Sequence, residues 1–384
     1  MRAYKRMSIF IPKEIISNEN RVAAIPATVK SYVKKEITVY VESGAGAGAF
    51  ISDEEYKNSG AIIVDDPERI YSQADIILKV NPPSMHEVVM MKEHAIVISL
   101  IQTTKALDVV QKYLDKKITG FSMHLIPRTT LAQKMDALSS QASIAGYKAV
   151  LVGACQIGKY MPLLMTAAGT ILPSKVLILG AGVAGLQAIA TAKRLGALVE
   201  AFDVRSVVKE QVESLGAKFI EVLADEEEGV GGGGYAKETS EAYKERQIAL
   251  IKEHVAKADL VISTALIPGR PAPILITHEM VDGMSAGSVI IDLAAENGGN
   301  CELTKPGEVS HINGVTIDGR LNWPSTIPIH ASQLYAKNIL ALVDHLYPKG
   351  ELNLNIEDEI IASAMFTHDG EVKDKSTVEA MRFK

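Results

Sequence analysis

Short apolar runs alternate with segments of helical periodicity along most of the chain, and this alternation predicts an α/β protein. In the first third, residues 8–11, 37–42, 61–64, 76–80 and 95–100 predict strands. Segments typical of helices, such as residues 28–34 and 53–59, lie between them. Strands separated by helices indicate a parallel sheet, because each helix carries the chain back across a face of the sheet.

The same alternation returns after residues 135–166, a long segment of mixed polarity that predicts a helix. The strands predicted beyond it are residues 176–179, 198–202, 218–220, 260–263, 288–292 and 315–317. Residues 328–346 predict another helix, and an Asp-Gly pair within residues 352–372 predicts a hairpin.

The length of 384 residues suits two domains. We therefore expect two Rossmann-like parallel-sheet domains. One is discontinuous and consists of residues 1–138 and 328–384. The other, the nucleotide-binding domain, is inserted into it and spans residues 139–327.

Residues 175–203 form the most informative segment, because an apolar strand runs directly into a glycine-rich turn and a helical pattern. The turn reads Gly180-Ala-Gly-Val-Ala-Gly185. Gly180 permits the tight turn, Gly182 lets the backbone approach a pyrophosphate, and Gly185 lets the helix pack close to the strand. The start of the helix then offers unpaired N–H groups and a partial positive charge to the phosphates.

Asp203 ends the second strand of this segment, where a carboxylate can accept the ribose hydroxyls of a dinucleotide. This favours NAD over NADP, since a 2′-phosphate would meet a negative charge; Arg205 nearby softens that preference. The loop over residues 264–273 also follows a strand, and its Pro/Gly turns favour a rigid, cofactor-facing loop. The residues expected to contact the cofactor are Gly180, Gly182, Val183, Ala184, Gly185, Asp203, Val204, Arg205, Thr264, Ala265 and Leu266.

Three further segments each have two interpretations. Arg128, Gln133, Asp136 and Ser139 lie on a loop entering a helix, and either orient a carboxamide and a ribose or cap that helix. The acidic and glycine-rich residues 225–235 are either a solvated loop or a lid that ends in Tyr235. Acids at residues 292–301 either act on a substrate proton or position a turn. The glycine spacing of residues 44–49 does not fit a second nucleotide site, and favours a plain turn.

Composition excludes several other classes of function. The net charge of -6, without a basic block, argues against a nucleic-acid partner. Cys155 and Cys301 lie far apart and the nine histidines are scattered, so we expect no metal site. The N-terminal residues do not resemble a signal peptide, and the longest uncharged apolar run carries the glycine turn. We therefore expect a cytoplasmic protein that is not inserted into a membrane.

Taken together, these segments resemble the NAD(H)-binding component, domain I, of proton-translocating NAD(P) transhydrogenase, over nearly the whole chain. The segments that carry the resemblance are IPKE and NENRVAAIP near the start, MDALSSQASIAGYKAV, MTAAGT, GAGVAGLQAIATAKRLGA, GGYAKE, TALIPGRPAP and DLAAENGGNC.

This resemblance implies that the chain binds NADH and that Tyr235 closes over it. Hydride then passes directly to NADP+ on a separate NADP(H)-binding subunit, and a membrane-spanning subunit couples the transfer to inward proton movement. The resemblance also implies a homodimer, peripheral to the inner membrane through its partners. The residues to which it gives catalytic roles are Arg128, Gln133, Asp136, Ser139 and Tyr235.

The chain also resembles alanine dehydrogenase, which has the same two-domain plan. It shares Arg21 and Lys79, which in that enzyme hold the keto acid, but Gln102 replaces the catalytic His and Glu296 the catalytic Asp. Oxidation of alanine must move a proton as well as a hydride, whereas transfer between two nicotinamides needs only aligned rings. We therefore prefer a transhydrogenase subunit, with an alanine dehydrogenase-like oxidoreductase and a non-catalytic NAD(H) sensor as alternatives.

Overall fold

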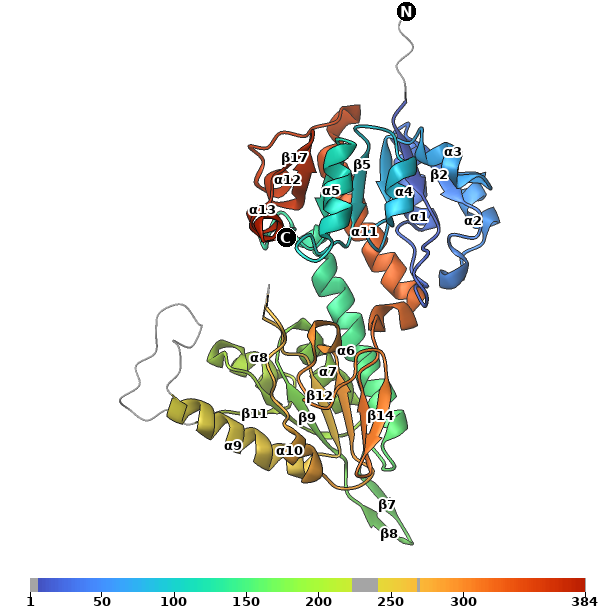
Figure 1. Ribbon diagram of the computed structural model, residues 1–384. Coiled ribbons are helices and arrows are strands. Elements are labelled where there is room, and N and C mark those ends of the chain that lie inside the picture. The colour runs from blue at the N-terminus through green and yellow to red at the C-terminus, as the bar shows by residue number, and fades with distance from the viewer. Residues whose placement is uncertain (1–5, 223–240, 268–269, 384) are drawn as a thin grey trace, which may run out of the picture. The chain divides into compact units, whose positions relative to one another are not determined.

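The computed structural model describes residues 6–222, 241–267 and 270–383 (Figure 1). The chain forms two compact units, one from Met1–Gln141 with Ser325–Lys384 and the other from Ala142–Pro324. Each unit has its own sheet. Tyr235 and the rest of the glycine-rich segment lie outside the described residues.

The first unit contains a sheet of eight strands, of which the first six along the chain run parallel. Across the sheet these six follow the order 3-2-1-4-5-6 of a doubly wound fold. The last two strands extend the sheet, and each runs antiparallel to the strand before it in the sheet. From one edge to the other the strands are β17 (Glu371–Val372), β16 (Met365–His368), β6 (Thr119–Ser122), β5 (Ile96–Ser99), β4 (Ile76–Leu78), β1 (Ser8–Ile11), β2 (Thr38–Glu42) and β3 (Ile62–Val64).

Helices cover both faces of this sheet. Ile9 and Ile11 face one hydrophobic core and Phe10 faces the other, as the alternation of side chains along a strand requires. The first core includes residues of α1 (Pro26–Lys34), α2 (Asp53–Asn58), α11 (Pro328–Leu346) and α12 (Glu359–Ala364). The second includes residues of α3 (Pro67–Tyr71), α4 (Met85–Met90), α5 (Leu107–Asp115) and α13 (Lys375–Arg382).

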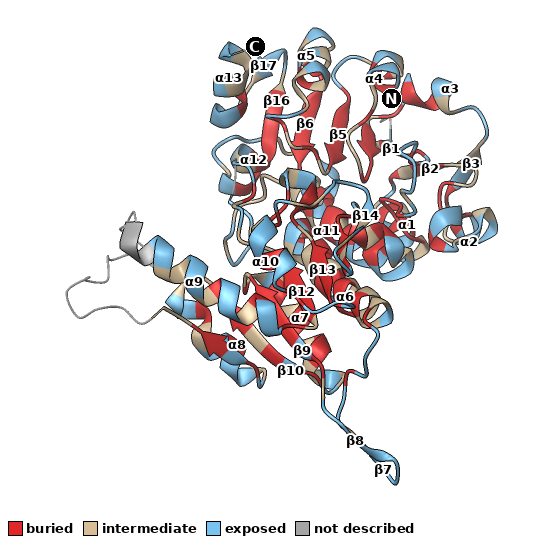
Figure 2. Ribbon diagram, turned by 60° about the horizontal axis from the view of Figure 1, so that its bottom comes forward, coloured by how far each residue is buried: buried red, intermediate tan, exposed pale blue. Residues whose placement is uncertain are grey.

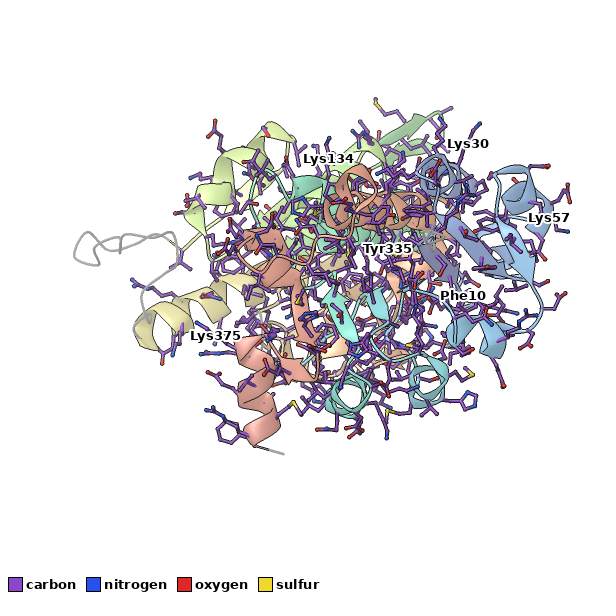
Figure 3. The ribbon with its side chains drawn as sticks, turned by 90° about the horizontal axis from the view of Figure 1, so that it is seen from above. Phe10, Lys30, Lys57, Lys134, Tyr335 and Lys375 are labelled. Atoms are coloured by element: carbon purple, nitrogen blue, oxygen red, sulfur yellow. The ribbon has the colours of Figure 1, made fainter. Side chains whose placement is uncertain are left out.

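Buried contacts of α11 hold the C-terminal residues in the first unit. Tyr335 is fully buried, and its hydroxyl donates to the carbonyl of Lys79 at 2.8 Å. Figure 3 shows Tyr335 within the unit, whereas Lys30 and Lys57 lie at its rim. The expected discontinuous first domain is thus confirmed in its architecture.

The second unit contains a sheet of seven strands, and its six parallel strands follow the same 3-2-1-4-5-6 order when the antiparallel edge strand is left out of the count. Only the last strand in this sheet runs antiparallel to its neighbour. The strand order reverses at β9, which pairs with both β10 and β12. From one edge to the other the strands are β11 (Lys218–Ile220), β10 (Leu198–Phe202), β9 (Lys175–Leu179), β12 (Leu260–Ser263), β13 (Val289–Asp292), β15 (Val315–Asp318) and β14 (Val309–Ile312).

Helices again cover both faces, and Figure 2 shows the central strands of this sheet buried between them. Val176 and Ile178 share a core with residues of α6 (Ala137–Gln156), α7 (Val183–Arg194) and α8 (Lys209–Ser214). Leu177 and Leu179 share the opposite core with residues of α9 (Glu241–Lys257) and α10 (His278–Asp282). The remaining short helices are η1 (Ala47–Ala49), η2 (Gln133–Met135), η3 (Ser206–Val208), η4 (Ala295–Asn297), η5 (Trp323–Thr326) and η6 (Pro348–Gly350).

The expected fold class, two Rossmann-like parallel-sheet domains, is confirmed, and so is the turn at residues 44–49, which joins β2 to α2 through η1. The predicted helix over residues 135–166 is wrong in extent, because α6 ends at Gln156 and a hairpin of β7 (Leu164–Thr166) and β8 (Gly169–Ile171) follows. The predicted C-terminal hairpin covers only β16 and β17, with Asp369 and Gly370 left-handed at its turn. In the described ranges no helix combines the length and apolarity needed to cross a membrane.

Candidate functional site

The glycine turn lies where β9 ends and α7 begins, at the point where the strand order of the second sheet reverses. Gly180 has φ +100, a backbone conformation that side chains with a Cβ rarely adopt. Its N–H donates to the carbonyl of Phe202 at 2.8 Å, and a Cβ here would lie 2.6 Å from Thr264 Oγ1. Glycine is therefore required at this turn for both conformation and space.

Close packing at the start of α7 needs two more glycines. A Cβ on Gly185 would lie 1.9 Å from the carbonyl oxygen of Gly180. On the other side, a Cβ on Gly146 of α6 would lie 2.0 Å from the carbonyl oxygen of Ala184. The sequence prediction included Gly185 but missed Gly146; a glycine inside a helical pattern is the feature that indicates such a contact.

Gly182 is the N-cap of α7, and no side chain caps this helix end. The first N–H groups of a helix have no acceptor within the helix, which here leaves those of Val183, Ala184 and Gly185 for an external acceptor. A Cβ on Gly182 would meet nothing within 4 Å. The turn thus combines open space with unpaired donors, the arrangement that holds a phosphate at a helix N-terminus.

Asp203 follows β10 and lies beside this turn. One carboxylate oxygen accepts the N–H of Ala181 at 2.7 Å, and the other accepts the N–H of Arg205 at 2.9 Å. The Arg205 guanidinium also binds both oxygens, each at 2.9 Å. Burial alone would raise the pKa of Asp203, but the Arg205 side chain and the two backbone donors outweigh it and lower the pKa below its usual value. A carboxylate is therefore present here at neutral pH.

The loop after β12 is tied to the same turn. Thr264 Oγ1 donates to the carbonyl of Gly180 at 3.0 Å. Asn300, which is fully buried, accepts the N–H of Ala265 at 3.0 Å and donates to the carbonyls of Ala265 at 2.9 Å and Pro273 at 2.8 Å. Leu266 is 53% exposed. Asn300 thus ties Ala265 to Pro273. It was missed from the sequence, where nothing distinguishes it from an ordinary turn residue.

Asp292 at the end of β13 is a structural residue in this geometry. Its carboxylate accepts hydrogen bonds from three backbone N–H groups and two hydroxyls, those of Ala294, Asn300, Cys301, Ser263 and Thr304. These donors fill its acceptor positions. Glu296 accepts the N–H of Asn322 at 2.9 Å at an exposed position. The geometry favours turn positioning over acid–base work for both residues.

The loop that carries Arg128 and Gln133 belongs to the first unit and enters α6. Asp136 accepts the N–H of Ser139 at 2.9 Å and its hydroxyl at 2.6 Å, so this pair caps α6. Buried Met135 and a bond of 2.8 Å from Asn338 to the carbonyl of Lys134 anchor the loop. Arg128 and Gln133 are exposed. The loop thus presents two long polar side chains from a fixed backbone.

Lys79 and Arg21 lie in a buried ionic cluster of the first unit. Lys79 Nζ is 2.7 Å from Glu87 Oε1 and 3.6 Å from Glu14 Oε2. Arg21 binds both oxygens of Glu19, at 2.8 and 2.6 Å, and donates to Gln141 at 2.9 Å. Burial raises the pKa of Glu14. The charges of both cations are therefore balanced within the protein.

The structure brings one set of predicted site residues together at the carboxyl edge of the second sheet: Gly180, Gly182, Val183, Ala184, Gly185, Asp203, Val204, Arg205, Thr264, Ala265 and Leu266. Arg128, Gln133, Asp136 and Ser139 are grouped on one loop of the first unit. Among the described residues, no group of three His, Cys, Asp or Glu side chains is arranged to hold a metal ion.

Two family models match the chain. The model described as alanine dehydrogenase/PNT, N-terminal domain, matches residues 10–145. The model described as alanine dehydrogenase/PNT, C-terminal domain, matches residues 149–375. Together they account for nearly the whole chain.

Individual relatives agree with these matches. An NAD(P) transhydrogenase alpha-subunit chain of Rhodospirillum rubrum is 46% identical over 95% of this chain and 97% of its own length. An alanine dehydrogenase of Methanococcus maripaludis is 30% identical over 97% of this chain and 96% of its own. The crystal structure of transhydrogenase from Sinorhizobium meliloti is 45% identical and has a TM-score of 0.87. This match covers 95% of this chain and 99% of the crystallised chain. The chain therefore belongs to the alanine dehydrogenase/PNT family and is a homologue of the alpha subunit of NAD(P) transhydrogenase.

Proposed function

We propose that this chain binds NAD(H) at the carboxyl edge of its second sheet and takes part in direct hydride transfer to NADP+ on a partner subunit. The observation that carries this proposal is the combination of the uncapped helix N-terminus at Gly182 with the Asp203 carboxyl group, which accepts the N–H of Ala181 beside it. The first suits a pyrophosphate and the second a ribose diol, at the sheet position where doubly wound folds bind dinucleotides.

Each group has a defined task in this proposal. The N–H groups that follow Gly182 bind the pyrophosphate, and Asp203 binds the adenosine ribose. Arg128, Gln133, Asp136 and Ser139 orient the nicotinamide carboxamide and its ribose, and Tyr235, outside the described residues, closes over the nucleotide. A hydride leaves NADH with both bonding electrons and adds to NADP+, giving NAD+ and NADPH. No proton is transferred in this step, so positioning and exclusion of water suffice.

The buried ionic cluster of the first unit disfavours the alanine dehydrogenase alternative. A carboxylate substrate that bound Lys79 or Arg21 would have to compete with Glu87 or Glu19, which already pair with them at 2.7 and 2.6 Å. Removing a partner from a buried ion pair costs about 3–5 kcal/mol. We therefore assign Lys79 and Arg21 a structural role in this chain.

We also propose that the chain works as a homodimer, with a membrane-spanning subunit and an NADP(H)-binding subunit, on the cytoplasmic side of the inner membrane. The β7–β8 hairpin projects from the second unit (Figure 1). Apolar side chains are exposed on the hairpin and directly after it, with Met165 of β7 73% and Leu172, the residue after β8, 76% accessible. A second copy of the chain is the occupant that would bury them. Met165→Asp with Leu172→Asp should yield a monomer in sedimentation, whereas the exposed control Val309→Asp should not.

Hydride transfer in a two-protein mixture tests the proposed function. The purified chain is combined with an NADP-binding domain of a transhydrogenase loaded with NADPH. An oxidised NAD analogue is added whose reduced form absorbs at a wavelength distinct from NADPH. Reduction of the analogue should require both proteins. No turnover, with NADH binding intact, would favour an NAD(H) sensor, and turnover with L-alanine and NAD+ by the chain alone would favour a dehydrogenase.

A variant of the exposed loop tests the proposed nicotinamide contacts. Gln133→Asn shortens the side chain by one methylene and should slow transfer by about tenfold or more, since a shift of about 1 Å at a reacting centre is costly. Gln73→Asn makes the same change at another exposed position of the first unit and should not alter the rate. If Gln133→Asn transferred hydride at the rate of the parent, the loop would have no role in positioning nicotinamide, and only its helix-capping role would remain.

A further inference from the structure

Asp203 already accepts four hydrogen bonds in this structure. An ionised carboxylate offers about four lone-pair positions on its two oxygens. The N–H of Ala181 and the N–H of Arg205 take one on each oxygen, at 2.7 and 2.9 Å. Arg205 Nε and Nη2 take the other two, each at 2.9 Å. A ribose diol would therefore compete with the Arg205 guanidinium for the two carboxylate oxygens.

We propose that Arg205 is a displaceable latch on Asp203 that sets both the affinity for NAD(H) and the discrimination against NADP(H). The proposal rests on the proposed NAD(H) site and assigns a specificity role within it. In the closed state the guanidinium occupies the acceptor positions that a ribose needs. In the open state the same guanidinium is beside the 2′ position, where it would neutralise a 2′-phosphate.

The local geometry suits such a latch. The two backbone donors hold the carboxylate without the Arg205 side chain, so opening the pair leaves Asp203 in position. The Arg205 side chain is 37% exposed while that of Asp203 is 6% exposed. The guanidinium thus has a path to solvent, and the carboxylate stays behind as the fixed part of the site. Because solvent reaches the Arg205 side of the pair, the guanidinium can exchange for a ligand.

Removing the latch has opposite consequences for the two nucleotides. In Arg205→Leu both side-chain donors are lost, and two positions on Asp203 become available without a competing cation. An exposed ion pair contributes up to about 1 kcal/mol, so the Kd for NADH should fall about two- to fivefold. The Kd for NADPH should rise by a similar factor, because the 2′-phosphate then meets Asp203 alone. The ratio of the two Kd values should therefore change by roughly tenfold.

The experiment measures NADH and NADPH binding by calorimetry for the parent, Arg205→Leu, Arg205→Lys and Arg194→Leu. Arg194 is exposed near the far end of α7, so its variant matches the change in charge without touching Asp203. Arg205→Lys keeps the charge but cannot bind both oxygens as a fork. It should gain NADH affinity without losing NADPH affinity. Adenosine 5′-monophosphate and adenosine 2′,5′-bisphosphate, which differ only in the 2′-phosphate, should repeat the pattern.

Ionic strength gives a readout that a merely structural role of Arg205 would not change. Salt weakens a partly exposed ion pair, so the latch in the parent opens more easily as ionic strength rises. The difference between the Kd values of Arg205→Leu and the parent for NADH should therefore become smaller as ionic strength rises. Weaker NADH binding by Arg205→Leu, or an unchanged ratio of the two Kd values, would overturn the latch. Absence of NADH binding by the parent itself would instead overturn the proposed function.

Discussion

Replacing Gly182 by alanine should abolish tight nucleotide binding while leaving the fold intact. Gly182 has φ −76 and ψ −167, an extended conformation open to any residue, and an added Cβ would meet nothing within 4 Å. The free energy of unfolding should therefore change by less than about 0.5 kcal/mol. The same methyl group occupies the space through which a pyrophosphate would approach the helix N-terminus. We expect the Kd for NADH to rise at least about tenfold, which is about 1.4 kcal/mol.

Two other glycines serve as matched controls for this prediction. A Cβ on Gly185 would lie 1.9 Å from the carbonyl oxygen of Gly180, so Gly185→Ala must shift the backbone. Overpacking of this kind costs about 1–3 kcal/mol, and both stability and binding should fall. A Cβ on Gly158 would meet nothing within 4 Å, and Gly158→Ala should alter neither quantity.

Urea unfolding and calorimetric titration with NADH separate the two effects. Gly182→Ala should have the unfolding midpoint of the parent and a Kd for NADH that is at least about tenfold higher. Parent-like NADH affinity in this variant would refute the placement of the pyrophosphate at the N-terminus of α7. A fall in unfolding free energy as large as that of Gly185→Ala would refute the argument from open space.

Three further variants test other parts of the structure. Gly146→Ala should lower the unfolding free energy by about 1–3 kcal/mol, because its Cβ would lie 2.0 Å from the carbonyl oxygen of Ala184; an unchanged urea midpoint would contradict that contact. Asp203→Asn should weaken NADH binding by about 1.5–3 kcal/mol and narrow the discrimination against NADPH, since the charged acceptor is lost; unaltered Kd values would remove Asp203 from the site. Burial, and then the charge of Lys105, lower the pKa of His124 from 6.5 to about 4. The neutral imidazole therefore contributes fully to the free energy of unfolding above pH 6.5, and this contribution is lost as the pH falls towards 4. The loss is at most about 3 kcal/mol, and His124→Gln should unfold with a smaller difference between pH 7 and pH 5 than the parent.

The fold was largely predictable because both sheets are built from buried parallel strands. Such strands are continuous apolar runs, and the predicted strand at residues 198–202 coincides with β10. Prediction failed where a strand lies at an edge or carries small polar residues. β6 contains Thr119, Gly120 and Ser122, and β14 has an exposed, mixed pattern, so neither has an apolar signature. The hairpin of β7 and β8 is mostly exposed, and for the same reason β7 was included in the predicted helix over residues 135–166 and β8 was not predicted.

The candidate site was predictable where a backbone conformation demands a residue type. Gly180 needs a positive φ, and Gly185 needs the absence of a Cβ, so both leave a mark in the sequence. Gly146 and Asn300 act through contacts between elements that are distant along the chain. Their role depends on which helix or loop packs against them, which only the folded structure shows.

Two parts of the candidate site, the bonds of Asn300 and the Asp203–Arg205 ion pair, should respond differently to pH and salt. The amide of Asn300 is fully buried, carries no charge and does not titrate, so neither acid nor salt changes its three bonds to Ala265 and Pro273. The Asp203–Arg205 pair, by contrast, is partly exposed and weakened by ions. Ala265 and Pro273 should therefore keep their relative positions across cellular conditions, while the proposed ribose contact at Asp203 follows the ionic strength of its surroundings.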